Sequence, residues 1–216
     1  MAVSLFYGMT QSGKTSLAKK MIAQVKRAII FDFTGTIDVQ NGVILEQFDT
    51  DYLLSIFMKH RDLKSFKLIF RPRGIDVETR FNRIALLALA LGKKAVQRGD
   101  TDRLVYLIDE ADFVCTPTYQ SKELKTLINV GRHDGVDSWL IARMPQRLHT
   151  DARGNASTVF CFKLVDDSAV SYIRKSIGKT GAEKLRTLEQ YSFLAWKDNG
   201  DHMIVDKNAK IIESWR

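Results

Sequence analysis

The stretch GMTQSGKT at residues 8–15 restricts the fold of this 216-residue chain more than any other feature. The apolar run AVSLFY precedes it, and the residues that follow, 14–25, have the apolar spacing of a helix. The two glycines let the backbone curl between a strand and a helix, so that several N–H groups point inward toward phosphate oxygens. The pattern G-x-x-x-x-G-K-T is that of the P-loop, or Walker A motif, and it predicts an α/β fold with a phosphate-binding site.

The residues of this loop have distinct expected roles. Lys14 should reach the β- and γ-phosphates of a nucleotide, and the hydroxyl of Thr15 should ligate Mg²⁺. The residues expected to surround the nucleotide are Gly8, Met9, Thr10, Gln11, Ser12, Gly13, Lys14, Thr15 and Ser16. The alternative is a glycine turn that binds no ligand, which the flanking strand and helix argue against.

A second part of a nucleotide site follows the apolar run LVYLI, which reads as a strand covered on both faces. Asp109 comes directly after it, at the sheet edge where ligands gather in open α/β folds, and should bind Mg²⁺ as the Walker B aspartate. Glu110 can polarise a water for attack on the γ-phosphate, which favours hydrolysis over phosphate transfer to a small molecule. The alternative is that Glu110 and Asp112 only begin a loop. The letters DEAD at 109–112 do not indicate a helicase of that name, which needs a second motor domain.

Strands and helices alternate along the rest of the chain, which argues for a largely parallel sheet flanked by helices. The expected strands are 2–8, 27–33, 66–70, 104–109, 138–143 and 157–164, and the expected helices are 14–25, 50–60, 76–98, 121–130 and 167–187. The segment 34–42 reads as a turn-rich connection, and the helix at 76–98 is apolar all round at its centre, so it should pack against the sheet.

The C-terminal segment 191–206 contains Asn199-Gly200, a strong hairpin signal, so antiparallel strands should be added at one sheet edge. We therefore predict one RecA-like P-loop NTPase domain of the ASCE type over 1–216. Its core should span about 1–165, with C-terminal helices and the hairpin at about 166–216.

Two arginines are candidates for added positive charge in phosphoryl transfer. Arg132 is expected at a helix end and Arg143 at the end of the strand that follows. An arginine supplied by a neighbouring subunit can contribute about 10³–10⁵ in rate. If Arg132 points outward, it could enter a neighbour's site in a ring or filament; otherwise it is solvated or ion-paired. His133 beside it is expected to be structural.

The P-loop, LVYLIDEAD, GRHDGVD and ARMPQRL…RGNAS together resemble the FtsK–HerA superfamily of DNA-pumping ATPases over about 3–164. Within it, the sequence looks most like the compact genome-packaging ATPases of tailless icosahedral viruses with an internal membrane. The two Walker motifs are shared by many families, whereas GRHDG followed by R-x-P-x-R-L is the more specific element.

This resemblance implies ATP and Mg²⁺ as ligands and a set of residue roles. It places Lys14, Glu110 and Arg132 in catalysis, and Thr15 and Asp109 at the metal; Arg143 is a catalytic candidate from its expected place at the end of a strand and not from the resemblance. Arg132 matches the arginine that acts across subunits in related pumps, and Asn155 matches an asparagine before the next strand.

The same resemblance implies a homo-oligomeric ring, a hexamer or pentamer, that moves double-stranded DNA without sequence preference. A capsid vertex or portal protein would be a further partner. The expected location is the host cytoplasm or the virion vertex, with no direct membrane insertion.

One position departs from the family pattern. Relatives usually carry a glutamine γ-phosphate sensor at the end of the strand after Walker B, and here that position is Arg143. Arginine can contact phosphate but cannot accept a hydrogen bond from the attacking water. Gln146, three residues on, is an alternative sensor.

The formal charge of +8 suits a polyanionic partner such as nucleic acid, although a generally basic protein is the alternative. The candidates for DNA phosphate contacts are Arg71, Arg73, Lys122 and Lys125, and Tyr119 could stack on a strand. Each of them could equally be an ordinary surface or rim residue.

The two cysteines, Cys115 and Cys161, lie in apolar surroundings without metal-ligand spacing, which predicts free core thiols in a reducing compartment; a disulfide between them is the less favoured alternative. The longest apolar run, 84–91, is too short to cross a bilayer, so a soluble protein is expected.

Two other classes remain open at this stage. A small-molecule P-loop kinase would be monomeric with an arginine-rich lid, and Glu110 counts against it. The second class is a nucleotide-dependent assembly or switch protein. If such a protein were a GTPase it would need an NKxD-type guanine-binding motif, and Asn208-Ala209-Lys210 does not provide one. A membrane-anchored phage assembly ATPase should carry a transmembrane segment, and no apolar run in this sequence is long enough for one, so this class is not favoured.

Overall fold

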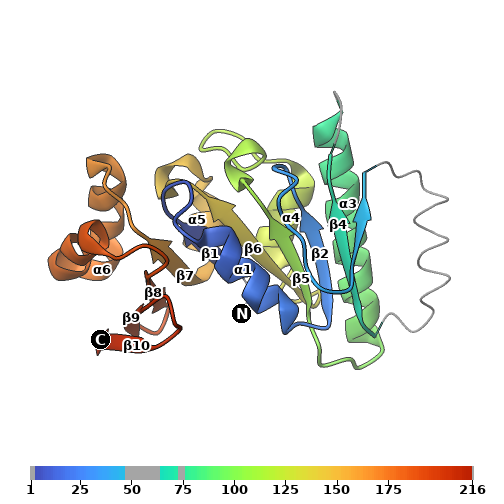
Figure 1. Cartoon of the computed structure of the whole chain (residues 1–216). Helices are drawn as coiled ribbons and strands as arrows, with labels where there is room; N and C mark the ends of the chain where they lie inside the picture. The colour runs from blue at the N-terminus through green and yellow to red at the C-terminus, as the bar shows by residue number, and fades with distance from the viewer. Residues whose placement is uncertain (1–2, 47–63, 73–75, 216) are drawn as a thin grey trace.

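A computed structural model describes residues 3–46, 64–72 and 76–215, and the helix expected at 50–60 lies outside them. The described residues form a ten-stranded sheet with helices on both faces (Figure 1). The strands are β1 (Val3–Tyr7), β2 (Arg27–Phe31), β3 (Gly42–Leu45), β4 (Phe66–Phe70), β5 (Leu104–Ile108), β6 (Val136–Ala142), β7 (Ala156–Phe162), β8 (Phe193–Lys197), β9 (His202–Val205) and β10 (Ile211–Trp215). The helices are α1 (Lys14–Ala23), α3 (Val77–Gln97), α4 (Lys122–Val130), α5 (Thr150–Gly154) and α6 (Asp167–Thr187), with short 3₁₀ turns η1 (Ala111–Phe113) and η2 (Pro145–Arg147).

The strand order is β10-β9-β8-β7-β1-β6-β5-β2-β4-β3. All neighbours from β7 to β3 pair in parallel, whereas β8, β9 and β10 pair antiparallel beyond β7. Strand β6 lies between β1, which leads into the P-loop, and β5, which leads into Asp109 and Glu110. This interposed strand is the arrangement expected of the ASCE type, and the predicted fold class is confirmed.

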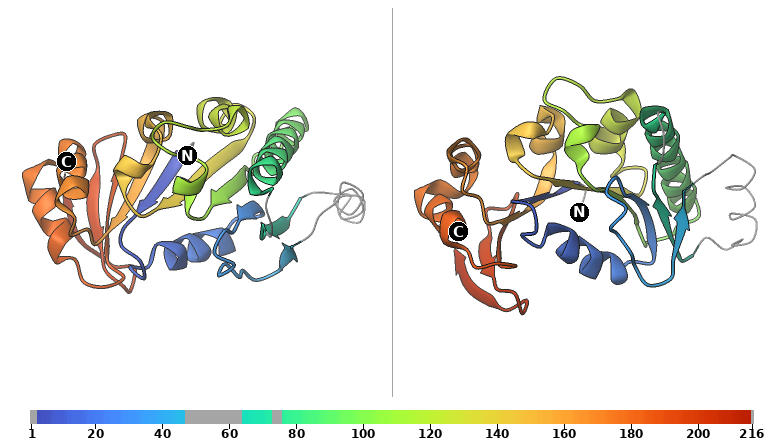
Figure 2. Two further views of the ribbon diagram at one scale, coloured as in Figure 1. Left: turned by 90° about the horizontal axis from the view of Figure 1, so that it is seen from above. Right: turned by 45° about the horizontal axis from the view of Figure 1, so that its top comes forward.

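The core lies on both faces of the sheet because consecutive strand residues point to opposite sides. In β1, Val3, Leu5 and Tyr7 face a large cluster that also holds residues of α3, α4 and α6, while Phe6 faces a second cluster with Ala18 and Ile22 of α1. Figure 2 shows α1 on one side of the sheet and α3, α4 and α5 on the other. Strands covered on both faces explain the unbroken apolar runs in the sequence.

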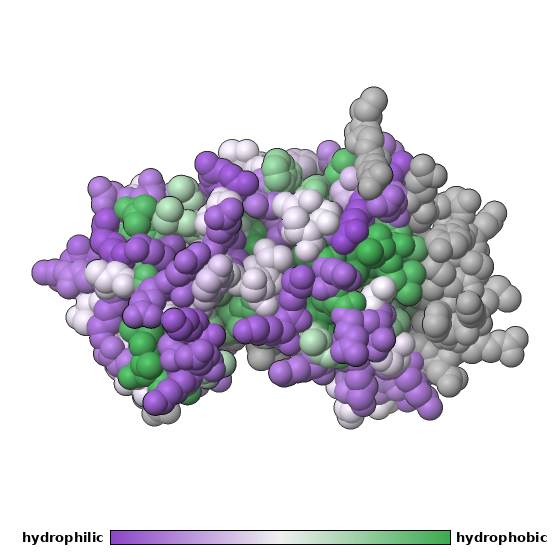
Figure 3. Space-filling view, viewed as in Figure 1, coloured by the Kyte–Doolittle hydropathy of each residue, from purple (hydrophilic) through white to green (hydrophobic). Residues whose placement is uncertain are grey.

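Helix α3 packs less completely than its sequence suggests. Phe81, Ile84, Ala85 and Ala88 are buried, but Leu86 in the middle of the apolar stretch is 53% exposed. The helix packs against the sheet as predicted, but it lies over one face of the sheet, so only one side of the helix finds a partner (Figure 1). A scattered exposed leucine is normal on a soluble surface, and Figure 3 shows a mostly hydrophilic face broken by apolar groups.

Three elements of the fold were not predicted from the sequence: β3, α5 and β10. Strand β3 begins where the turn-rich segment ends, after Asn41 in a left-handed conformation, and pairs in parallel with β4. Strand β10 joins the predicted hairpin of β8 and β9, whose turn places Gly200 at a φ of +86°. The C-terminal antiparallel strands are thus confirmed and extended by one.

Two further expectations concern the whole chain. Cys115 and Cys161 are both free and buried, as predicted. Across the described ranges, no helix combines the length and the apolar character that a bilayer span requires.

Candidate functional site

The P-loop takes the strained backbone path that its glycines predict. Gly8 has a φ of +146°, Gln11 of +60° and Gly13 of +113°. A Cβ on Gly8 would lie 2.6 Å from the Cβ of Phe162 on β7, so any larger residue would displace the loop from the sheet. Close approach to β7 therefore requires glycine here.

Backbone hydrogen bonds fasten the loop to the ends of the two neighbouring strands. The N–H of Gly8 donates to the carbonyl of Arg143 after β6, at 3.4 Å, and the N–H of Met9 donates to the carbonyl of Lys163 after β7, at 3.3 Å. The hydroxyl of Ser12 is buried and has no hydrogen-bond partner among the described residues. A buried hydroxyl without a hydrogen-bond partner lowers the stability of a fold, so this position fits a loop that binds a polar ligand.

Lys14 lies inside this loop. Its ammonium donates to the carbonyls of Gly8 and Met9, both at 2.8 Å, and the residue is 7% exposed. Burial lowers the pKa of Lys14, while the nearby carboxylates of Glu110 and Asp109 oppose that shift. The ammonium is thus held by loop carbonyls in a position where phosphate oxygens could replace them.

Asp109 is buried at the end of β5. Its carboxylate accepts a hydrogen bond from the hydroxyl of Thr34 at 2.7 Å, and its N–H donates to the carbonyl of Phe31 at 3.0 Å. Burial raises the pKa of Asp109, and the Thr34 hydroxyl opposes that shift. An oxygen ligand held at the carboxyl edge of the sheet fits the predicted metal role.

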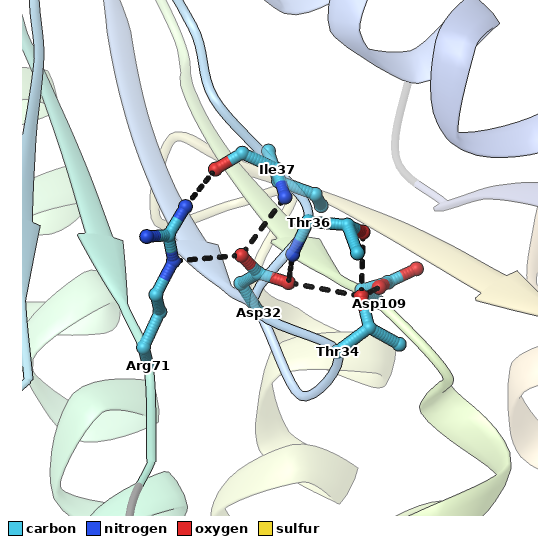
Figure 4. A network of polar contacts seen from close by, with 6 residues as sticks. All are labelled: Asp32, Thr34, Thr36, Ile37, Arg71 and Asp109. Carbon is cyan, nitrogen blue, oxygen red and sulfur yellow. Dashed lines mark hydrogen bonds and ion pairs between the residues drawn. The ribbon is translucent and has the colours of Figure 1, made fainter.

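A second buried carboxylate, Asp32, stands behind Asp109 and was missed from the sequence (Figure 4). Asp32 accepts from the hydroxyl of Thr34 at 3.2 Å and from the N–H groups of Thr36 and Ile37 at 3.2 and 2.9 Å. Thr34 therefore bridges the two carboxylates. The sequence contains a pattern that could have identified Asp32, since this residue follows the apolar run RAIIF just as Asp109 follows LVYLI.

The same network corrects the expectation for Arg71. Its Nε donates to Asp32 at 3.1 Å and a terminal nitrogen donates to the carbonyl of Ile37 at 2.8 Å (Figure 4). With its side chain only 19% exposed, Arg71 neutralises a buried carboxylate and is not a free DNA contact. Arg73 lies outside the described residues.

Glu110 has left-handed backbone angles, with a φ of +46°, and pairs with Arg143. The two side chains approach at 3.4 Å through both carboxylate oxygens. Because β6 lies between β1 and β5, Arg143 at its end stands between the P-loop and the Walker B carboxylates. Strain of this kind in a non-glycine residue is typical of functional sites.

Glu110 and Arg143 border a cavity of about 240 Å³ that also includes Asp112 and Arg147. Arg147 pairs with Asp112 at 3.7 Å. Burial raises the pKa of Asp112, and the charge of Glu110 adds to that shift. The cavity thus combines two carboxylates and two guanidinium groups beside the end of β5.

Gln146 does not take the place of the missing sensor glutamine. Its amide donates to the hydroxyl of Ser168 at 2.9 Å, so it is turned toward α6. Arg143 is the polar residue that meets Glu110, and the alternative sensor predicted from the sequence is not supported.

Arg132 lies at the other end of the sheet. Arg132 lies between α4 and β6, just before β6 begins. Strands β6 and β1 run parallel and begin side by side, and the P-loop follows the end of β1. The length of β1, five residues, therefore separates Arg132 from the P-loop. At about 3.3 Å per residue this is about 16 Å. Arg132 is exposed and donates to the ring of His133 at 3.1 Å. Its action in a neighbouring subunit stays a prediction.

Other candidates lie around the molecule's surface. Asn155 donates to Asn129 at 2.9 Å and so links α5 to α4 at the same edge as Arg132. Lys122 and Lys125 are exposed on α4, and the hydroxyl of Tyr119 donates to Glu78. Their contacts with DNA stay predictions.

The described residues contain no group of three or more His, Cys, Asp or Glu side chains that could hold a metal by themselves. The predicted pair, Thr15 and Asp109, supplies one hydroxyl and one carboxylate, which fits Mg²⁺ because this ion takes its other ligands from water and phosphate oxygens.

Comparison of the fold with solved structures gives a match over the whole chain. The genome-packaging NTPase B204 of Sulfolobus turreted icosahedral virus 2, in complex with AMPPCP, superposes with a TM-score of 0.72 over 100% of this chain and 97% of that chain, at 19% identity. This chain has the fold of a viral genome-packaging NTPase. B204 of Sulfolobus turreted icosahedral virus, described as a DNA-packaging ATPase, gives a TM-score of 0.68 at 18% identity, covering 100% of this chain and 97% of that chain.

Another solved structure matches with a lower TM-score. ATPases 2 and 3 of EssC from Geobacillus thermodenitrificans match with a TM-score of 0.55 at 15% identity, over 91% of this chain and 38% of that chain. No protein-family model and no curated protein sequence matches the chain. The matches thus confirm the P-loop NTPase fold that the motifs predict.

Proposed function

We propose that this chain is an ATP-hydrolysing, ring-forming DNA translocase that packages a double-stranded viral genome. The observation that carries the proposal is the position of Glu110, which stands across β6 from the P-loop strand and close enough to Lys14 to affect its pKa. A carboxylate in that place suits activation of a water, which a nucleoside kinase does not need. The match to B204 of Sulfolobus turreted icosahedral virus, a DNA-packaging ATPase, supports the choice of DNA as the polymer that is moved.

In this mechanism the P-loop backbone and Lys14 bind the phosphates of ATP, and Lys14 exchanges its loop carbonyls for phosphate oxygens. Thr15 and Asp109 would hold Mg²⁺, which when bound neutralises phosphate charge. Thr34 orients the carboxylate of Asp109. Glu110 accepts a proton from the attacking water.

Arg143 has two roles in the proposal. In the structure it pairs with Glu110, and with nucleotide bound its guanidinium turns to the terminal phosphate, which releases the carboxylate. Arg132 of an adjacent subunit supplies further charge in a hexameric or pentameric ring. The charge of +8 favours non-specific contact with DNA phosphates, and a capsid vertex or portal protein would anchor the ring.

The test is the ATPase rate of the purified protein with and without linear double-stranded DNA. The proposal expects DNA to raise the rate, and it expects Glu110→Gln to retain ATP binding while losing about 10²–10⁴ in turnover. Glu183→Gln, on the exposed face of α6, is the matched control. Phosphate transfer to a nucleoside monophosphate, with no response to DNA, would instead identify a kinase.

A further inference from the structure

A cavity of about 340 Å³ lies on the side of the P-loop away from Glu110. Phe162 on β7 and Phe193 on β8 form part of its wall, whereas Glu110 follows β5, on the opposite side of β1 in the strand order. Its volume falls within the range of about 300–1,000 Å³ that is typical of small-molecule sites. The cavity thus lies between the P-loop and the C-terminal strands, because its lining includes Gly13 and Phe193.

One wall belongs to the P-loop and the first turns of α1. Gly13, Leu17 and Lys20 follow one another at helical spacing, and Ser16 comes directly after the predicted metal ligand Thr15. If the terminal phosphate points toward Glu110, the triphosphate leads away from β5 and across the start of α1. The nucleoside must then leave the P-loop beside this wall.

Tyr191 provides the facing aromatic surface. It lies in the connection between α6 and β8, is 50% exposed, and has a φ of +66°. Its Cδ1 would be 3.0 Å from a Cβ placed on Gly13, so the ring lies directly against the P-loop. A bulky residue in this backbone region is a conformational outlier, and such outliers concentrate at binding sites.

The turn between β9 and β10 closes the cavity. A single carboxylate oxygen of Asp206 accepts from the N–H groups of Asn208 and Lys210 at 2.9 and 2.8 Å, and this holds the turn in shape. Asn208 also lines the cavity. A side-chain amide offers both a donor and an acceptor, the pair that the edge of adenine complements.

We propose that this cavity binds the adenine nucleoside of the nucleotide, with Tyr191 stacking on the base and Asn208 hydrogen-bonding to its edge. The inference rests on the proposed function only in that the P-loop binds a triphosphate. It assigns base recognition to the C-terminal strands, outside the two Walker motifs.

The test compares the equilibrium dissociation constants of ATP and inorganic tripolyphosphate, measured by calorimetry on the same protein. Tyr191→Ala should weaken ATP binding about tenfold, since stacking on an aromatic ring is worth about that much, and leave tripolyphosphate binding unchanged. Tyr191→Phe keeps the ring and should bind ATP like the unmodified chain. Ile212→Ala, exposed on β10, is a control that should change neither affinity.

Asn208→Ala gives a second, independent reading that does not depend on Tyr191. It should reduce the preference for ATP over GTP while leaving tripolyphosphate binding intact. The proposal is overturned if the unmodified protein binds ATP no more tightly than tripolyphosphate, or if Tyr191→Ala weakens both ligands equally. Tight, base-selective ATP binding without hydrolysis in the presence of DNA would support the cavity and reject the translocase.

Discussion

Replacement of Arg143 by alanine separates the two effects that this residue has on turnover. Loss of the ion pair frees Glu110, and with Arg143 49% exposed such a pair contributes about 0.2–1 kcal/mol, or at most about fivefold. Loss of the guanidinium also removes positive charge beside the terminal phosphate, and removing one such donor typically costs about 10²–10³ in kcat. The second effect is the larger, so Arg143→Ala should lower kcat by about 10²-fold.

The assay is steady-state ATP hydrolysis with saturating double-stranded DNA, together with ATP binding measured separately. Arg143→Gln introduces the glutamine that is usual at this position in the family that the sequence resembles. This variant should retain more activity than Arg143→Ala because the glutamine amide can still donate to phosphate. If Arg143→Ala hydrolyses ATP as fast as the unmodified chain or faster, Arg143 only restrains Glu110 and its role at the phosphate is rejected.

Three further variants probe the surroundings of the site. Thr34→Val removes the hydroxyl donor to Asp109, so the Mg²⁺ concentration needed for half-maximal ATP binding should rise about 10-fold, and an unchanged Mg²⁺ titration would argue against the positioning role. Arg71→Met leaves its buried carboxylate partner without a counter-charge and should lower the free energy of unfolding by about 3 kcal/mol in urea denaturation; a loss below about 1 kcal/mol would contradict the network. Arg132→Ala should bind ATP yet lose turnover, and mixing it with Glu110→Gln subunits should restore activity, because each supplies what the other lacks; no recovery in mixed rings would remove the action across subunits.

The P-loop and the Walker B strand could be predicted because each depends on a short stretch of sequence. Glycines at fixed spacing dictate the loop, and an apolar run followed by Asp109 dictates a buried strand that ends in a ligand. The mostly parallel sheet could also be predicted from the alternation of strands and helices, whereas the place of β6 between β1 and β5 was seen only in the structure.

The remaining parts of the site depend on contacts between distant segments. Asp32 acts through Thr34 and Arg71, and no spacing rule in the sequence connects β2 with the end of β4. Tyr191 meets Gly13 only because β8 pairs beside β7 and β7 beside β1. Gln146 was a candidate for the γ-phosphate sensor because it lies three residues after Arg143 in the sequence. In the structure its side chain, in the turn η2, points to α6.

The most direct test of the central claim is a crystal structure with Mg²⁺ and a non-hydrolysable ATP analogue. We expect the terminal phosphate beside Lys14, a water between that phosphate and the Glu110 carboxylate, and Arg143 moved from the carboxylate to the phosphate. A terminal phosphate bound elsewhere, or a Glu110 side chain directed away from it, would contradict the assignment of this carboxylate to hydrolysis.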